Sequence, residues 1–307
     1  MNGFFGIAPS RSCFPFLLLI PLLLGTAACE DSFIDPFDNE DRYYTVYGFL
    51  DQMKNFEPGA VQTLRIIPIT RFPERIDSPA HPQADLDAVV TTTNLNTGQT
   101  RRWAHTLEPL SDGTYAHIFR AALFVQAGHT YRLSVARSDG ITATAETTVP
   151  APSSIQATLA APRVDPASGD VTQDVLLSGT PALWDILVIY RVGNDFGATP
   201  YPLPYGRVGT PTDDDHWRFT VNISNDRRRL SNLLRIPVSA VEFPAMGLEI
   251  RLLDGRWVPP EGSFDPEVLA QPGALSNVEN GYGFWGSIGL YQHDWRISNE
   301  LRNLLGF

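Results

Sequence analysis

Residues 129–149 read HTYRLSVARSDGITATAETTV, and this stretch sets the fold class. Apolar Tyr131, Leu133 and Val135 alternate with polar residues, and the same alternation resumes after residue 140. Alternation with a period of two places the apolar side chains on one face of a β-strand. Between the two runs stands Asp139-Gly140, and glycine accepts the positive φ that a tight hairpin turn requires. The stretch therefore predicts a β-hairpin.

Alternating runs of the same kind recur N-terminal to this hairpin, separated by turn residues at the spacing of short strands. With the hairpin included, the predicted strands are Tyr43 to Leu50, Gln62 to Ile69, Leu86 to Leu95, Thr100 to Leu107, Thr114 to Arg120, His129 to Arg137 and Ile141 to Val149. Such a series is typical of an antiparallel sandwich rather than of helices. We therefore expect an all-β fold that begins with an immunoglobulin-like sandwich over residues 43–150.

Pro150 to Ser154 is predicted to end this first domain, because a proline cannot donate to a strand ladder. A second β-rich domain is predicted over residues 151–307. Its predicted strands are Val171 to Ser178, Trp184 to Val192, Trp217 to Ile223, Leu233 to Val238 and Leu248 to Leu253. Within them, Ile186 to Tyr190 is apolar on both faces, which is typical of a central strand. The run Arg227 to Arg229 is interpreted as a solvated turn or a strand end.

Two long segments of the second domain, Gly193 to His216 and Trp257 to Leu275, are rich in proline, glycine and aspartate and are predicted to be loops. The chain ends with Trp295 to Leu305, where apolar residues recur at helical spacing. We expect one short amphipathic helix there, docked on the second domain.

Residues 1–28 are typical of a bacterial lipoprotein signal peptide. The apolar run Phe14 to Leu24 is shorter than the roughly 20 residues that a membrane-spanning helix needs. It precedes Gly25-Thr26-Ala27-Ala28-Cys29, which resembles a lipobox except at Thr26, where leucine is commonest. We expect cleavage before Cys29 and attachment of fatty chains to its thiol, since stable anchoring needs more than one chain. The alternative is ordinary secretory cleavage after Ala28, which leaves a free thiol.

Residues 29–42 follow as an acidic stretch, with six aspartates and glutamates between Glu30 and Asp41. Too little of it is apolar to order itself by burial, so it is predicted to be a flexible tether. Acidic residues directly after the lipidated cysteine also resemble the surface-export signal of Bacteroidetes-type lipoproteins.

The net charge and the cysteine count exclude one class of partner and one kind of cross-link. The formal net charge is −11, and a surface without a basic patch repels the phosphate backbone, so nucleic acid is excluded as a partner. The two cysteines are Cys13 and Cys29, and Cys13 lies in the segment predicted to be removed. The mature chain therefore has no pair of cysteines for a disulfide within the chain.

Several stretches together resemble a known family. They are Tyr44 to Leu50, Ala127 to Val135, Thr147 to Pro150 and Asn277 to Gly286. With the signal peptide and Cys29, their order and spacing resemble the uncharacterised "domain of unknown function 4249" lipoproteins of Bacteroidetes and relatives. The resemblance implies an outer-membrane lipoprotein, often beside receptors that import nutrients, and it supplies no catalytic residues.

No motif for catalysis stands out in the sequence, and we expect no enzymatic activity and no cofactor. Metal-binding histidine pairs, paired cysteines, a phosphate loop and a nucleophile elbow are all missing from it. His105, His117 and His129 are spaced twelve apart, which is compatible with neighbouring strands. The weak metal candidates are Asp213, Asp214, Asp215 and His216, because hard cations prefer several carboxylates on one loop.

Aromatic residues in the predicted loops are the candidates for ligand contact. Tyr201, Tyr205 and Trp257 stand in polar surroundings, where rings on loops stack on sugars or anchor a protein partner. Packing in the core is the competing interpretation, and it is favoured for Trp217 and Trp285. We expect a non-enzymatic binding or accessory module that meets a receptor or a glycan. The alternatives are a metal-dependent hydrolase built on the Asp213 to His216 loop, and a purely structural envelope protein.

Overall fold

The computed structural model describes residues 42–69, 75–180, 183–193, 197–206, 210–213, 216–254 and 276–307. Strands dominate these residues, which form three β-sheets and two short α-helices. The prediction of an all-β fold, with a sandwich first, a second β-rich part and a short C-terminal helix, is confirmed. No helix among the described residues is long and apolar enough to cross a bilayer. The predicted signal peptide and Cys29 lie outside the described residues.

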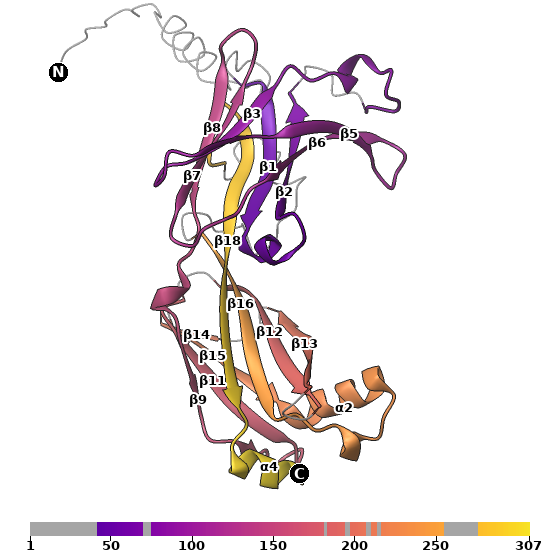
Figure 1. The fold of residues 1–307 in the computed structure, drawn as a ribbon, viewed down its shortest axis with the longest axis vertical. Helices are drawn as coiled ribbons and strands as arrows, with labels where there is room; N and C mark the ends of the chain where they lie inside the picture. The colour runs from indigo at the N-terminus through magenta and orange to yellow at the C-terminus, as the bar shows by residue number, and fades with distance from the viewer. Residues whose placement is uncertain are drawn as a thin grey trace, which may run out of the picture. The chain divides into compact units, whose positions relative to one another are not determined.

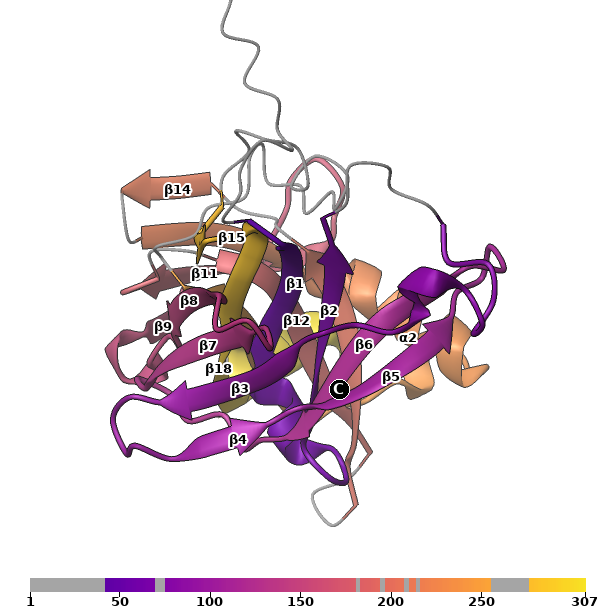
Figure 2. The ribbon, with the colours of Figure 1, turned by 90° about the horizontal axis from the view of Figure 1, so that it is seen from above.

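The first sandwich has two facing sheets. One contains, in spatial order, β5 (Ala104–Pro109), β6 (Tyr115–Ala122), β2 (Val61–Pro68), β1 (Tyr44–Asp51) and the first half of β18 (Tyr282–Arg296). The other contains β4 (Thr100–Arg102), β3 (Val89–Asn94), β7 (Thr130–Ala136), β8 (Thr142–Thr148) and β17 (Val278–Glu279). In Figure 2, β3, β7 and β8 lie side by side and cross the direction of β1 and β2. The predicted hairpin is β7–β8, with Thr130 paired to Thr148.

The core of the first sandwich fills with side chains from the inward faces of both sheets. Its fully buried large residues include Phe119, Tyr131 and Trp285. The core packing favoured for Trp285 is therefore confirmed, although this residue comes from the far end of the chain. Trp103 lies where the predicted strand Thr100 to Leu107 splits into β4 and β5, which belong to different sheets.

The 15-residue strand β18 takes part in both halves of the fold (Figure 1). Its first half pairs in parallel with β1, from Thr45 opposite Tyr282 to Asp51 opposite Ile288. Its second half pairs antiparallel with β16 (Ala245–Leu253), starting again at Ile288. One strand thus joins the two halves into a single eight-stranded sheet.

The second half packs the rest of that sheet against a five-stranded sheet. The eight-stranded sheet continues through β16 to β12 (Leu183–Val192) and β13 (Thr199–Gly206). The five-stranded sheet contains β10 (Arg163–Val164), β11 (Val171–Ser178), β15 (His216–Asn222) and β14 (Thr210–Asp213), with β9 (Gln156–Leu159) also on β11. Four 3-10 helices complete the described elements: η1 (Gln52–Phe56), η2 (Pro82–Ala84), η3 (Pro152–Ser154) and η4 (Val238–Ala240). The central strand predicted at Ile186 to Tyr190 is confirmed as part of β12, which is paired on both sides.

Several local predictions are wrong. Leu233 to Val238 is not a strand, and Arg227 to Arg229 is not a turn, because α2 (Ile223–Leu234) occupies this region. The side chain of Asn222 caps this helix by accepting a hydrogen bond from the backbone N–H of Asn225 at 2.9 Å. The predicted loop Gly193 to His216 contains strands β13 and β14. Pairing with a neighbouring strand overrides the low strand propensity of its prolines.

The C-terminal helix is shorter than predicted. α4 spans Asn299–Leu305, and Trp295 belongs to β18 instead. Ser298 starts the helix by accepting a hydrogen bond from the backbone N–H of Leu301, and Gly306 ends it with a φ of 77°. Only Leu301 of this helix is fully buried, so one face docks on the core as expected.

Candidate functional site

The structure places the two described ligand-contact candidates in a strand rather than in a loop. Tyr201 and Tyr205 lie in β13, partly buried, and both pack against the core of the second half. This placement favours core packing for both, and a role in ligand contact stays a prediction. Trp257 lies outside the described residues.

Tyr205 also takes part in a buried carboxylate cluster that the sequence did not suggest. Asp226, 1% exposed near the start of α2, accepts hydrogen bonds from the hydroxyls of Tyr190 at 2.7 Å and Tyr205 at 2.5 Å. Its other oxygen accepts from Arg229 at 3.2 Å. Burial and the charge of Asp226 raise the pKa of both tyrosines. The carboxylate of Asp226 and the two tyrosine hydroxyls thus bond to one another. These hydrogen bonds hold α2 on the sheet through β12 and β13.

The predicted metal loop is only partly described. Asp213 ends β14 and His216 begins β15, whereas Asp214 and Asp215 lie outside the described residues. Among the residues that the structure does describe, no three histidine, cysteine or carboxylate side chains are grouped to hold a metal. The hydrolase alternative is not tested by these residues and stays a prediction.

The histidines spaced twelve apart come together only in part. His105 on β5 and His117 on β6 are neighbours, with Nε2 of the first 3.0 Å from Nδ1 of the second. The Nε2 atom of His117 lies 2.9 Å from the carbonyl oxygen of Gln83, so it carries the proton and Nδ1 accepts. His129 is elsewhere, against Asn94. Burial lowers the pKa of both paired histidines.

The first sandwich has a cavity of about 290 Å³ that no sequence motif predicts. One wall is the turn that follows β3, and the other is the segment that follows β6. Its lining residues are Asn94, Thr97, Gln99, Arg101, Ala122, Leu123, Phe124 and Gln126. A second cavity, of about 340 Å³, is lined by residues of β2 and β6 and of the segments 75–83 and 110–114.

Local hydrogen bonds fix the first wall of this cavity, hereafter the Phe124 cavity. The side-chain oxygen of Asn94 accepts from the backbone N–H groups of Asn96 at 3.0 Å and Thr97 at 3.3 Å, which is the geometry of an Asx turn. Its side-chain nitrogen lies 2.9 Å from Nδ1 of His129. Because Asn94 is 6% exposed and bonded on both sides, it holds the wall in one shape.

The two sides of the Phe124 cavity both offer groups that are not used by the fold: Phe124 follows β6, whereas Gln99 and Arg101 belong to the β3–β4 hairpin. The ring of Phe124 is 65% exposed. Within the described part of the chain, the side chains of Gln99 and Arg101 make no hydrogen bond or ion pair. The cavity thus combines an open aromatic face with an amide and a guanidinium that are free to bind.

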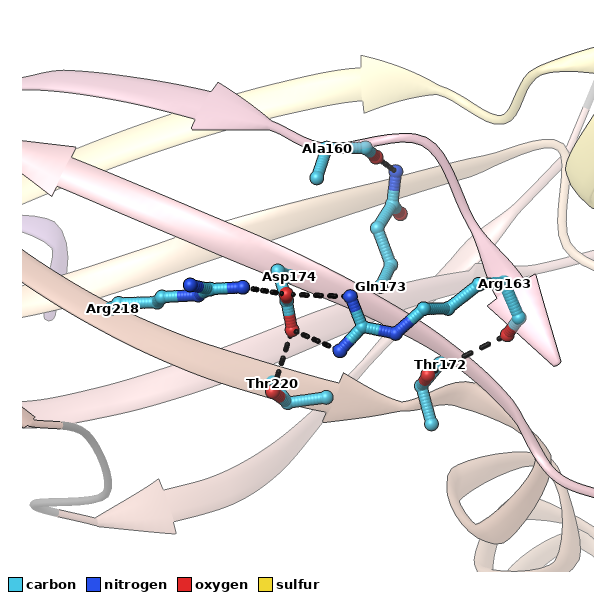
Figure 3. A network of polar contacts seen from close by, with 7 residues as sticks. All are labelled: Ala160, Arg163, Thr172, Gln173, Asp174, Arg218 and Thr220. Carbon is cyan, nitrogen blue, oxygen red and sulfur yellow. Dashed lines mark hydrogen bonds and ion pairs between the residues drawn. The ribbon is translucent and has the colours of Figure 1, made fainter. Parts of the chain in front are cut away.

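A polar network covers the outer face of the five-stranded sheet (Figure 3). Asp174 on β11 lies between Arg163 on β10 and Arg218 on β15, which approach it from opposite sides. One carboxylate oxygen accepts from Arg163 at 2.9 Å and from Arg218 at 2.5 Å, and the other accepts from Arg163 at 3.3 Å and Thr220 at 2.6 Å. We call Arg163 and Arg218 the arginine pair.

The electrostatics of Asp174 follow from these contacts. Burial alone would raise its pKa, but the hydrogen bonds from Arg218, Thr220 and Arg163 outweigh burial and lower the pKa of this carboxyl to about 2. Asp174 is therefore a permanent anion near neutral pH. It holds two guanidiniums in place while neutralising only one of them.

Comparisons with known proteins leave the family open. No family model and no curated protein matches the chain. Similar solved structures include pullulanase from Anoxybacillus sp. LM18-11, at 11% identity and a TM-score of 0.20, and that enzyme complexed with maltotriose, at 10% and 0.19. These matches cover 68% and 69% of this chain, which spans about a quarter, 24%, of each pullulanase chain. A likeness this distant carries no argument about function.

Proposed function

We propose that this chain is a lipid-anchored, non-enzymatic binding module of the bacterial outer membrane that holds a neutral saccharide in the Phe124 cavity. The observation that carries the binding role is the exposed ring of Phe124 beside two unused polar side chains, Gln99 and Arg101. An accessory role beside a nutrient-uptake receptor rests on the family resemblance and is kept as a hypothesis.

The chemistry of this cavity fits a sugar better than an apolar ligand. A pyranose ring has an apolar C–H face, which packs on an aromatic ring, and hydroxyl edges, which need donors and acceptors in fixed places. Gln99 offers both a donor and an acceptor, and Arg101 offers a planar fork of donors. The cavity volume of about 290 Å³ suits one or two sugar rings rather than a large ligand.

The anchoring part of the proposal has its own test. If the lipobox is used, the mature chain begins at Cys29 and this cysteine carries a thioether-linked diacylglycerol. Mass spectrometry of the N-terminal peptide from membranes of a lipoprotein-processing host should find this modification. An unmodified thiol, or a different first residue, would refute the anchoring while leaving the saccharide site untouched.

The Phe124→Ala variant should bind its saccharide at least about tenfold more weakly, because the stacking face is removed. Residues 42–307 are screened on an array of neutral oligosaccharides, and the tightest binder is titrated by calorimetry. Binding of no oligosaccharide in the array would overturn the saccharide proposal.

The matched control is Phe56→Ala. Phe56 is 72% exposed. Its neighbour Asn55 forms two hydrogen bonds with Val125, so Phe56 lies on a segment next to the one that carries Phe124. It does not line the Phe124 cavity. Its removal should leave the affinity unchanged. Equal losses in the two variants would mean that a general apolar surface, and not the cavity, binds the sugar.

A further inference from the structure

The arginine pair presents a surface of hydrogen-bond donors. Each oxygen of Asp174 already accepts two hydrogen bonds, so the carboxylate has little capacity left for a ligand. The two guanidiniums use only some of their N–H groups on it and have others to spare. A partner for this surface must therefore supply acceptors.

Exposure and charge point the same way. The side chains of Arg163 and Arg218 are 56% and 58% exposed, whereas that of Asp174 is 6% exposed. Both guanidiniums approach within 3 Å of the same carboxylate oxygen, so two positive charges converge over one negative charge. Asp170, which directly precedes β11, does not compensate them, because it is paired with Arg228 at 3.0 Å. The arginine pair and Asp174 together carry one net positive charge, in a chain whose net charge is −11.

We propose that the arginine pair binds the carboxylate of an acidic saccharide. The fork of a guanidinium matches a carboxylate in shape, and Asp174 holds both forks in place before the ligand arrives. Leu176 lies in register opposite Arg218 and is 40% exposed, which gives the C–H face of a sugar ring an apolar contact beside the charge. The arginine pair belongs to the five-stranded sheet of the second half, whereas the Phe124 cavity belongs to the first sandwich.

A membrane surface fits these observations less well. Recognition of anionic lipid headgroups is typical of clusters of about four to eight basic residues, and the arginine pair supplies two. Neighbours in register on this face include Thr158, Thr172 and Thr220, which carry hydroxyls rather than charges. Two guanidiniums held in place beside small hydroxyl side chains can bind one carboxylate of a ligand that lies flat on the sheet.

The probe is tetragalacturonate, and its methyl ester is the matched ligand in which the carboxylates are masked. Calorimetry with residues 42–307 in about 50 mM salt should detect binding of the acid form and at least about tenfold weaker binding of the ester. Raising the salt to about 300 mM should weaken the acid form further. Equal binding of acid and ester would overturn the proposal, and so would binding of anionic vesicles without binding of tetragalacturonate.

Variants then assign the binding to the arginine pair. Arg163→Gln combined with Arg218→Gln should weaken tetragalacturonate at least about tenfold. Arg132→Gln is the control, since Arg132 is 52% exposed and paired across strands with Glu146 on the first sandwich. Lysine at both positions keeps the positive charge without the planar guanidinium and should give intermediate affinity for tetragalacturonate. This double lysine variant replaces the double glutamine variant in the test if the latter fails to fold. Unchanged binding in the double variant would refute the site, whereas Phe124→Ala should leave tetragalacturonate binding intact.

Discussion

Replacing Gly283 with alanine is expected to lower the free energy of unfolding by about 4 kcal/mol. Gly283 has a φ of 88°, which side-chain-bearing residues adopt only at a cost of about 1 to 2 kcal/mol. A Cβ atom there would also overlap the carbonyl oxygen of Val46, its partner in register on β1. Backbone atoms cannot rotate away, so the parallel pairing of β1 and β18 must shift. Urea unfolding followed by tryptophan fluorescence measures the loss.

A matched glycine separates the two causes. Gly140 in the β7–β8 turn has a φ of 92°, and a Cβ atom there would meet nothing within 4 Å. Gly140→Ala should therefore cost only the conformational part, about 1 to 2 kcal/mol. The difference between the variants reports the clash with Val46. If both variants lost the same stability, the close approach of β1 and β18 at this position would be refuted.

The features that the sequence predicted well are local. The β7–β8 hairpin carries both its alternation and its Asp139-Gly140 turn in adjacent residues, and its observed strands, Thr130–Ala136 and Thr142–Thr148, lie within the predicted ones. The same holds for β12, whose apolar run Ile186 to Tyr190 predicts a central strand and which pairs with β13 and β16 on its two sides. In both elements, the residues that determine the strand or the turn lie within that element or directly beside it in the sequence.

Strand β18 could not be predicted in this way, because its pattern comes from distant partners. Gly283, Gly286 and Gly289 interrupt any alternation, and residues 282–287 are buried on both faces. The glycines are required by close contacts with Val46, with Phe49 and with Pro150, which lie far away in the sequence. A glycine-rich aromatic run thus becomes the longest described strand only when the tertiary contacts are known.

Helix α2 was missed for a different reason. Its sequence is mostly polar, and of its apolar residues only Ile223 and Leu230 are buried, so the helical stripe is weak. The available signal was the capping residue Asn222 before that stretch. The triple arginine was taken for a solvated turn because such runs are usually exposed, and here Arg227 is 8% exposed.

The candidate sites depend on strand register and loop contacts, which one sequence does not specify. Phe124 and Arg101 come from separate loops and strands, and no spacing rule joins them. The arginine pair needs β10 and β15 to flank β11 at Asp174, which is a property of the sheet order. The residue types were visible in the sequence, but their juxtaposition was not.

Arg227 connects three separate segments at the C-terminal end of the fold. Its guanidinium donates hydrogen bonds to the carbonyl oxygens of Val241 at 2.9 Å, Leu305 at 2.7 Å and Ser239 at 3.3 Å. It also lies over the ring of Phe307, 4.8 Å from the centroid. Burial lowers the pKa of this guanidinium, yet it stays charged because three carbonyl oxygens replace its water.

Arg227→Met keeps an apolar stem of similar length and should lower the free energy of unfolding by about 3 kcal/mol, because buried carbonyl oxygens lose a charged donor. Hydrogen exchange should rise over residues 299–307 first, since the helix α4 loses its tie to α2 at Leu305. Arg228→Met is the control, because this neighbour is 51% exposed and its pair with Asp170 contributes little in water. Equal stability of the two variants, with residues 299–307 still protected, would show that packing alone docks the C-terminal helix.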